Sequence, residues 1–237
     1  MNSKYYFYIT LILSVIVQIV TGIIEIGTLF VKVDTSYMII KQLLFLEVSV
    51  QIIEGLFYIW LLYHFNEVSN ITPKRYIDWI ITTPIMLITL IIYLIFLKHT
   101  EKGYDTSNLT IFNLLLENSG NISYIISLNF LMLLFGYLAE AKIIHTLTGV
   151  ILGFVPFLIY YYIIYINYVN QNQLGLQLFW YFFFFWSLYG LVAFLPYYTK
   201  NTFYNILDLF AKNFFGLFLT YIILSRNMEE LNSSIIL

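Results

Sequence analysis

Long runs of apolar residues recur along the whole chain, and this feature most limits its possible folds. A helix that crosses the hydrocarbon core of a bilayer needs about 20 consecutive apolar residues. Here 61% of the residues are hydrophobic and only 10% are charged, whereas soluble domains carry about 25% charged residues. A transmembrane β-barrel would show short alternating segments instead. The sequence therefore predicts an all-α, multi-pass integral membrane protein surrounded by lipid.

Seven of these runs are long enough to span a membrane, and no repeat or second domain separates them. We expect a single seven-transmembrane helix bundle over residues 1–237, with helices near 5–31, 36–65, 74–98, 122–141, 143–168, 175–198 and 203–226. A short surface helix or loop is expected at 109–120, and a link before the last helix at 199–202. The lysines and arginines of the loops slightly favour an extracellular N-terminus.

Composition excludes several classes of function. The chain has no cysteine, so it can form neither a disulfide nor a thiol-based site. Its net charge of −2 makes nucleic acid an unsuitable partner. Neither a metal site nor an enzymatic activity is expected.

Two ionisable residues lie within the last apolar segment. Asp208 and Lys212 are four residues apart, so they share one face of a helix. Charged side chains inside membrane helices are costly and usually functional. A buried lysine can lose its proton, pair with an acid, or form a covalent imine. From this segment alone, a structural ion pair and a functional lysine both stay open.

The third apolar segment adds a second acid. Asp78 and Thr82 share a helix face, and Arg75 lies about one turn earlier. Two carboxylates near one cation, with an arginine that offsets the excess negative charge, form a balanced cluster. A buried protonated imine needs such counterions because an isolated charge is very costly in an apolar interior.

These segments resemble the signatures of microbial rhodopsins. Residues 75–84, RYIDWIITTP, are similar to the third-helix motif, and residues 208–212, DLFAK, to the seventh-helix motif. Residues 135–141, FGYLAEA, look like the end of helix four in relatives of proteorhodopsin, and Trp186-x-x-Tyr189 resembles the sixth-helix wall of the retinal pocket. The motifs occur in the expected order over nearly the whole chain.

The resemblance implies a role for each matching residue. Lys212 would carry all-trans retinal as a Schiff base, with Asp78 as primary counterion and proton acceptor, Asp208 as second counterion, and Arg75 as the balancing charge. Thr82 would donate a hydrogen bond to Asp78. The implied retinal pocket consists of Tyr76, Trp79, Thr82, Thr83, Pro84, Asn129, Met132, Trp186 and Tyr189. Thr83 and Asn129 would link helices three and four.

Two positions depart from the family pattern. Gly190 stands where family members often have proline after the tyrosine of helix six. The segment Thr199-Lys200-Asn201 before the last helix has no acid, so the paired release glutamates of bacteriorhodopsin have no counterpart there.

The kind of transport depends on other residues. Thr89 occupies the position that commonly holds a carboxylic proton donor in pumps, and a threonine cannot donate in that way. Glu47 and Glu54 are seven residues apart on one helix face and could line a cation path. They could also be a displaced proton donor or lipid-facing side chains. Glu25 is a further candidate, either pore-lining or at a protomer interface.

Three functions stay open at this point. The glutamates of helix two resemble those of channelrhodopsins, and with the Asp-Thr-Thr pattern they look like rhodopsins of giant algal viruses, some of which conduct cations. A light-gated cation channel is the preferred hypothesis. The alternatives are an outward proton pump, because Asp78 is present, and a photosensory receptor. The transported ion would be a proton or a monovalent cation, and family members commonly form homo-oligomers.

Overall fold

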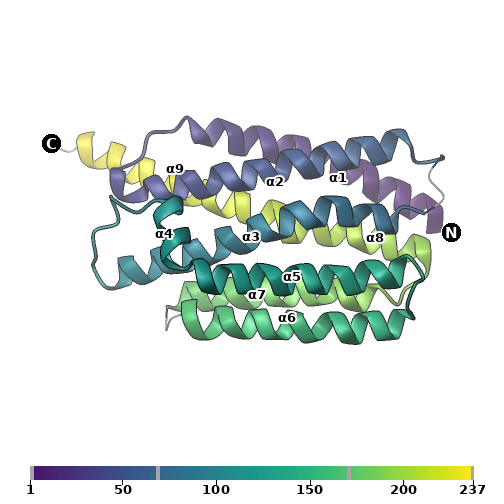
Figure 1. Cartoon of the computed structure of the whole chain (residues 1–237). Helices are drawn as coiled ribbons and strands as arrows, with labels where there is room; N and C mark the ends of the chain where they lie inside the picture. Colours follow the sequence, from purple (N-terminus) through teal and green to yellow (C-terminus); the bar gives the residue numbers. More distant parts are fainter. Residues whose placement is uncertain (1–2, 68–69, 170–171, 236–237) are drawn as a thin grey trace.

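The computed structural model describes residues 3–67, 70–169 and 172–235, and nearly all of them are helical (Figure 1). The long helices are α1 (Ser3–Leu29), α2 (Met38–Tyr63), α3 (Thr72–Glu101), α5 (Ser119–Glu140), α6 (Thr146–Tyr168), α7 (Gln173–Val192), α8 (Tyr197–Asp208) and α9 (Phe214–Ile235). Shorter elements are the 3₁₀ turn η1 (Thr35–Tyr37), the helix α4 (Ile111–Glu117) and the π-helical turn η2 (Leu209–Asn213).

Seven segments of the described chain are long and apolar enough to cross a membrane, and α8, η2 and α9 together make the seventh. The fold class is therefore confirmed as a seven-helix, all-α membrane bundle. The spanning helices run side by side, and the two chain termini lie at opposite ends (Figure 1). We call these the N-terminal end and the C-terminal end of the bundle.

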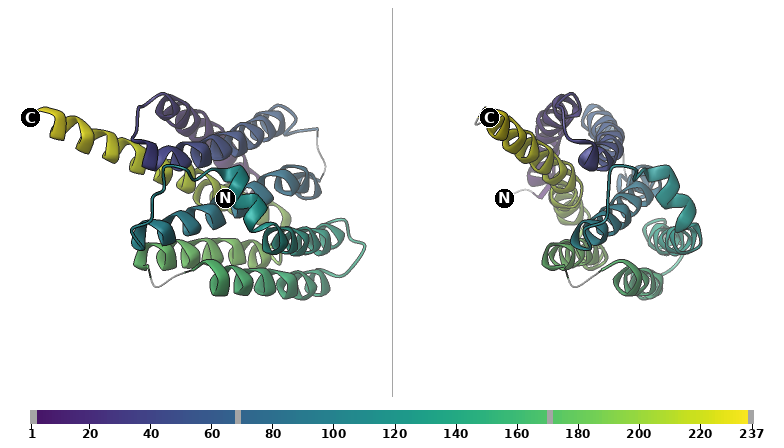
Figure 2. Two further views of the ribbon diagram at one scale, coloured as in Figure 1. Left: turned by 60° about the vertical axis from the view of Figure 1, so that its left-hand side comes forward. Right: turned by 90° about the vertical axis from the view of Figure 1, so that its left-hand side faces the viewer.

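The last two spans differ from their expected bounds. Helix α7 ends at Val192 rather than at 198, and Pro196 is the N-cap of α8. A proline has no backbone N–H to continue a helix, but its fixed φ suits a helix start. The expected link at 199–202 is thus the first turns of α8, and α9 continues past 226 to Ile235 (Figure 2). The short helix α4 falls inside the expected 109–120 segment.

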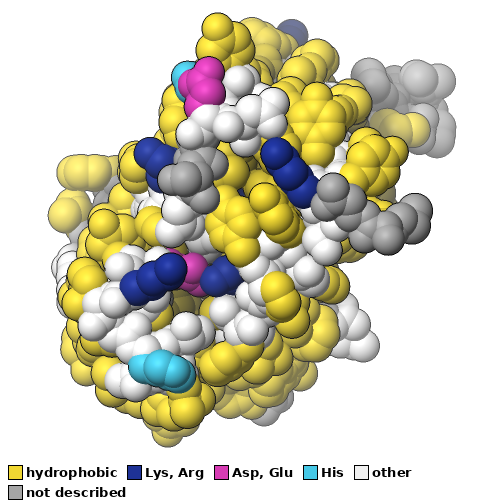
Figure 3. All heavy atoms as spheres, turned by 90° about the vertical axis from the view of Figure 1, so that its right-hand side faces the viewer, with side chains coloured by type: hydrophobic (Ala, Val, Ile, Leu, Met, Phe, Trp, Pro, Cys, Tyr) yellow, Lys and Arg dark blue, Asp and Glu magenta, His cyan; other side chains and the backbone are white. Residues whose placement is uncertain are grey.

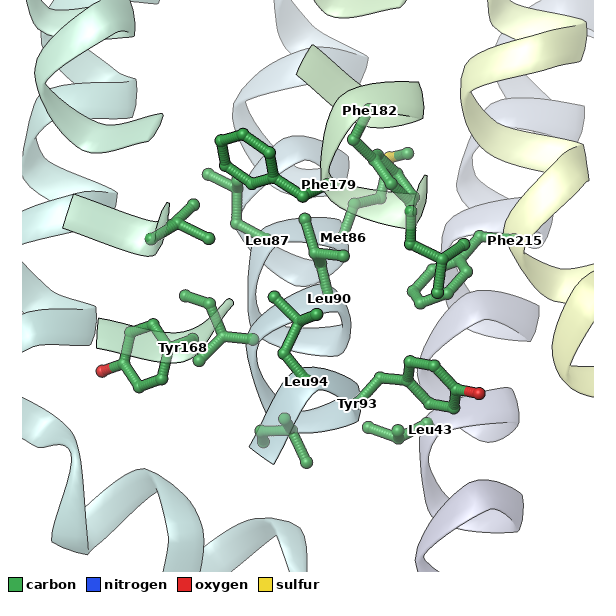
Figure 4. Packing of buried hydrophobic residues seen from close by; sticks show 14 of the residues in the cluster. Leu43, Met86, Leu87, Leu90, Tyr93, Leu94, Tyr168, Phe179, Phe182 and Phe215 are labelled. Atoms are coloured by element: carbon green, nitrogen blue, oxygen red, sulfur yellow. The ribbon is translucent and has the colours of Figure 1, made fainter. Parts of the chain in front are cut away.

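Helix α3 is the inner helix of the bundle. In its most apolar stretch 72% of the residues are buried, against 28% for α1, so α3 is surrounded by protein where α1 faces lipid. Leucines of α3 pack against aromatic rings of α7 and α9, and Figure 4 shows Leu87 and Leu90 beside Phe179, Phe182 and Phe215. This dry core holds the middle of α3, and with it Asp78 and Thr82, at a fixed position.

The outer surface is apolar along its sides and charged at its ends. Figure 3 looks onto the N-terminal end, where basic and acidic side chains gather among hydrophobic ones. One ion pair there joins α5 to α8, because the Lys200 ammonium donates to both carboxylate oxygens of Glu140 at 2.8 Å.

Candidate functional site

Lys212 is the centre of a buried charge cluster. It lies in the π-helical turn η2 and is 4% exposed. Its Nζ is 2.5 Å from Oδ2 of Asp78 on α3 and 3.5 Å from Oε1 of Glu54 on α2. Two carboxylates from two other helices thus stabilise one ammonium group in the bundle interior. The sequence pattern did not indicate Glu54 as a partner, because nothing in it relates the depth of α2 to that of η2.

Asp208 lies one turn before Lys212 but interacts with a different set of residues. Its carboxylate accepts hydrogen bonds from the hydroxyls of Tyr58 at 2.6 Å and Tyr189 at 2.7 Å. Arg75 approaches the same carboxylate at 3.4 Å. Among the described residues, Asp208 is therefore the partner of Arg75, while Asp78 and Glu54 are the acids in direct contact with Lys212.

Arg75 closes the N-terminal side of the cluster. Its side chain is fully buried, and its Nε donates to Oδ1 of Asn201 at 3.0 Å. Further donors of the guanidinium reach the Tyr58 hydroxyl and the side-chain oxygen of Asn205. Sequence reasoning missed Asn201 and Asn205, because they fall where a link or the first turn of a helix was expected.

A cavity lined mainly by aromatic and other apolar residues opens on the other side of Lys212. Of the residues implied by the resemblance, seven line it, namely Tyr76, Trp79, Thr83, Met132, Trp186, Tyr189 and Lys212. Thr82 donates to the backbone carbonyl of Asp78 at 3.0 Å rather than to its carboxylate. Asn129 donates to the Thr83 hydroxyl at 2.8 Å, which joins α5 to α3 beside the cavity.

Two glycines make room for aromatic side chains along this cavity. A Cβ atom at Gly136 would lie 2.5 Å from the Tyr76 hydroxyl, and one at Gly190 would lie 2.5 Å from the ring of Phe154. Both separations are shorter than side chains tolerate. Gly190, which departs from the family pattern, therefore lets Phe154 pack directly against α7, and the helix remains unbroken through Val192.

A second feature lies between α1, α2 and the last span. Nine buried polar side chains meet there, and we call them the polar seam: Ser14, Gln18, Thr21 and Glu25 of α1, Glu47, Gln51 and Glu54 of α2, Asn205 of α8 and Asn213 of η2. Gln51 donates to the Gln18 carbonyl at 3.0 Å and to the Thr21 hydroxyl, and Asn213 donates to Thr21 at 2.8 Å. The polar seam contacts Lys212 through the carboxylate of Glu54.

The three glutamates of the seam all point into the protein. Glu25, Glu47 and Glu54 are 1%, 2% and 0% exposed, and their carboxylate oxygens have no hydrogen-bond partner among the described residues. The alternative that Glu47 and Glu54 face lipid is therefore wrong. The burial of Glu25 within one chain likewise does not fit a side chain at a protomer interface.

Comparison with known proteins agrees with this geometry. The family of bacteriorhodopsin-like proteins matches residues 7–226, which include the lysine, both aspartates and the aromatic cavity. The chain belongs to this family, the microbial rhodopsins. Among curated proteins, no sequence matches this rhodopsin.

Solved structures of similar fold include a viral rhodopsin, OLPVRII, at 27% identity and a TM-score of 0.77, over 94% of this chain and 98% of that one. A blue light-absorbing proteorhodopsin from Med12 matches at 18% identity and 0.72, over 93% and 98% of the two chains. A proton-pumping rhodopsin of the marine alga Acetabularia acetabulum matches at 16% and 0.68, over 98% and 97%. The last two likenesses show the fold alone.

Membership of the family carries general properties. Microbial rhodopsins bind retinal and are light-driven ion pumps or channels. This rhodopsin has a buried lysine in contact with carboxylates and beside an aromatic cavity.

Proposed function

We propose that this rhodopsin binds all-trans retinal on Lys212 and acts as a light-gated cation channel. The observation that carries the proposal is the polar seam, a buried file of polar side chains that includes three carboxylates and touches Lys212 at Glu54. The proposed orientation has the N-terminus outside the cell, so that Arg75 lies toward the outside.

The residues around Lys212 fit retinal. The cavity is apolar and aromatic, as a conjugated polyene requires, and Trp79, Tyr189 and Trp186 contribute flat ring surfaces to it. Lys212 is the one lysine among its lining residues. Retinal, bound through its aldehyde to Nζ with loss of one water, supplies the light absorption and the change of shape. Asp78 and Glu54 stabilise the positive charge on that nitrogen.

The position of the seam supports a conducting path. The cavity lies between α3, α5, α6 and α7, while the seam lies between α1, α2 and the last span. Lys212 is the contact between the two, so a change at Nζ acts directly on Glu54. Carboxylates in a narrow polar file attract cations and repel anions, as charged rings do in cation channels. Water could hydrate these groups once the helices separate slightly.

Thr89 of α3 also supports a channel, because it stands where pumps commonly have their proton donor. Thr89 is buried, and its hydroxyl donates to the Ile85 carbonyl at 3.0 Å. A threonine has no proton to exchange near neutral pH. The contact of Asp78 with Lys212 at 2.5 Å favours a second candidate, an outward proton pump in which Asp78 accepts the proton and Glu47 replaces the missing donor.

Voltage-clamp recording of cells that express the retinal-loaded protein separates the two candidates. A channel gives photocurrents that reverse sign as the membrane voltage crosses the reversal potential of the permeant cation. Replacing sodium with a large organic cation should shift this potential. Currents that stay outward at every voltage would contradict the channel and support the pump. The matched control is Lys212→Ala, which should give no photocurrent.

Retinal attachment has its own test. Lys212→Ala purified with added retinal should show no visible absorption band, because no other amine lines the cavity. Lys200→Ala, which removes a lysine outside the cavity, should keep the band. Visible absorption that survives in Lys212→Ala would refute the attachment site.

A further inference from the structure

Glu25 is held in an unusual position near the C-terminal end of the polar seam. It belongs to α1, is 1% exposed, and its carboxylate lies directly against the backbone of Gly216 on α9. A Cβ atom at Gly216 would overlap that carboxylate, at 2.5 Å from its carbon and 2.8 Å from Oε2. Any residue other than glycine at 216 would therefore displace Glu25.

Gly216 connects this position to the retinal lysine. It follows Lys212 by four residues, so the two lie near one face of the last span, although Lys212 itself is in the π-helical turn, which offsets that face. Thr220 follows Gly216 by four more residues and is 4% exposed, and its hydroxyl has no partner among the described residues. Beyond Lys212, this face of α9 therefore has a gap at Gly216, where a side chain is missing, and then the Thr220 hydroxyl.

A second carboxylate lies nearby. Glu47 of α2 is 2% exposed. Gln51 of α2 donates to the Thr21 hydroxyl of α1, and one turn further along these two antiparallel helices Glu47 lies beside Glu25. The neighbouring cations are engaged elsewhere, since Lys212 pairs with Asp78 and Glu54, Lys41 donates to the Val31 carbonyl, and Arg226 pairs with Glu229. Among the described residues, neither Glu25 nor Glu47 forms an ion pair with a basic side chain, and the Thr89 side chain of α3 lies near the Glu47 carboxylate.

Electrostatics limits what such a pair can hold. Two neighbouring carboxylates in an apolar interior cannot both be ionised without a cation, because desolvation and mutual repulsion both oppose the second charge. A proton is the smallest cation that satisfies them. With a proton on each carboxyl group the pair carries no charge, so it does not attract a hydrated cation.

We propose that Glu25 and Glu47 form a proton-binding carboxylate pair that closes the C-terminal end of the polar seam in the dark, and that Gly216 is the positioning residue which admits Glu25 to it. The proposal rests on the seam being the conducting path, but the proton-binding site itself does not. Loss of the proton leaves a negative charge that attracts a cation, and the closed end becomes a conducting one.

The first test measures proton binding without light or transport. Infrared difference spectra of the full-length protein in lipid, recorded in the dark between acidic and alkaline buffer, should show the carbonyl band of a protonated carboxylic acid. Glu25→Gln and Glu47→Gln should each remove or shift the same band. In Gly216→Ala the band should move, because Glu25 no longer reaches its position. Unchanged spectra in all three variants would overturn the proposal.

The second test measures conduction. Photocurrents of Gly216→Ala should differ from those of the wild type, because the added Cβ displaces the Glu25 carboxylate, while the visible absorption band stays in place. Gly27→Ala is the matched control, because a Cβ there meets nothing within 4 Å. If Gly216 acts through Glu25, adding Gly216→Ala to Glu25→Ala should have no further effect. Independent effects of the two changes would contradict the positioning role.

The two readouts separate the possible failures. If the photocurrents are those of a channel but the infrared band is absent, the proposed function stands and the carboxylate pair is refuted. If the infrared band is present but the photocurrents are outward at every voltage, the carboxylate pair stands and the channel is refuted.

Discussion

At the scale of single residues, the immediate surroundings of Lys212 decide the chemistry of the site. Its Nζ lies 2.5 Å from Asp78 and 3.5 Å from Glu54, whereas Asp208 is occupied by Arg75 and two tyrosine hydroxyls. The electrostatic energy between two charges falls with their distance. In the proposed function Asp78 is therefore the dominant counterion, Glu54 is the second acid in contact with Lys212, and Asp208 acts from further away.

This order predicts the spectral effect of three matched substitutions. Asp78→Asn should shift the absorption band to the red most strongly, because the nearest negative charge beside the retinal nitrogen is lost. Glu54→Gln should shift it less in the same direction, and Asp208→Asn least. Visible spectra of the three purified variants check the order. A larger shift in Asp208→Asn than in Asp78→Asn would contradict the arrangement.

At the scale of helices, close contacts between backbones fix how the elements pack. Helices α5 and α6 approach each other at Gly149, where a Cβ atom would lie 2.5 Å from the Ala139 Cβ and 2.9 Å from the Phe135 carbonyl oxygen. In membranes, small residues at helix interfaces allow such packing and stabilise it. These two helices form one wall of the aromatic cavity, so their separation sets its width.

Gly149→Ala should therefore destabilise the protein by about 1–3 kcal/mol, since the backbone carbonyl at 135 cannot move aside cheaply. Thermal bleaching of the visible band should occur at a lower temperature than in the wild type. Gly120→Ala on α5 is the control, because a Cβ there meets nothing within 4 Å. Equal bleaching temperatures in the two variants would refute the close contact.

The ion pair between α5 and α8 gives a second prediction at this scale. Lys200 and Glu140 are 13% and 10% exposed and lie 2.8 Å apart at the N-terminal end. Lys200→Gln should lower stability by about 1 kcal/mol or less, as is usual for ion pairs near a protein surface. The double variant Lys200→Glu with Glu140→Lys should recover much of this loss. Bleaching temperatures of the single and double variants measure both effects.

At the scale of the whole molecule, the protein has two functional regions that meet at one residue. The aromatic cavity lies on one side of Lys212 and the polar seam on the other. Arg75 and its partners close the seam toward the N-terminal end, and Glu25 lies near the opposite end against Gly216. In the proposed function, light is absorbed in one region and ions pass through the other.

This division predicts that the seam can be blocked without a change of colour. Gln51 links α2 to α1 through its bonds to Gln18 and Thr21. Gln51→Leu should abolish most of the photocurrent, because it removes the polar group in the middle of the seam, and should leave the absorption band nearly unchanged. Ser49→Ala, on the same helix, is the control, since Ser49 bonds only its own helix at the Phe45 carbonyl. A normal photocurrent in Gln51→Leu would contradict conduction through the seam.

The fold class and the residues at the centre of the site could be predicted from the amino-acid sequence alone. Seven long apolar runs predict membrane helices, because within lipid a helix forms all the hydrogen bonds of its own backbone N–H and C=O groups. The motifs around Asp78 and Lys212 are local, so their spacing along a helix already indicated which residues share a face. Glu25, Glu47 and Glu54 stood out for a similar reason, as charged residues within apolar segments.

Only the tertiary structure decided which of these groups meet. The contacts of Glu54 with Lys212 and of Glu25 with Gly216 depend on the relative depth and rotation of separate helices. The π-helical turn η2 shifts the register at Lys212, so that Asp208 contacts Arg75 instead of the lysine. Helical periodicity predicts the face on which a side chain lies, but packing between helices selects its partner. The polar seam exists only because three such faces are packed together.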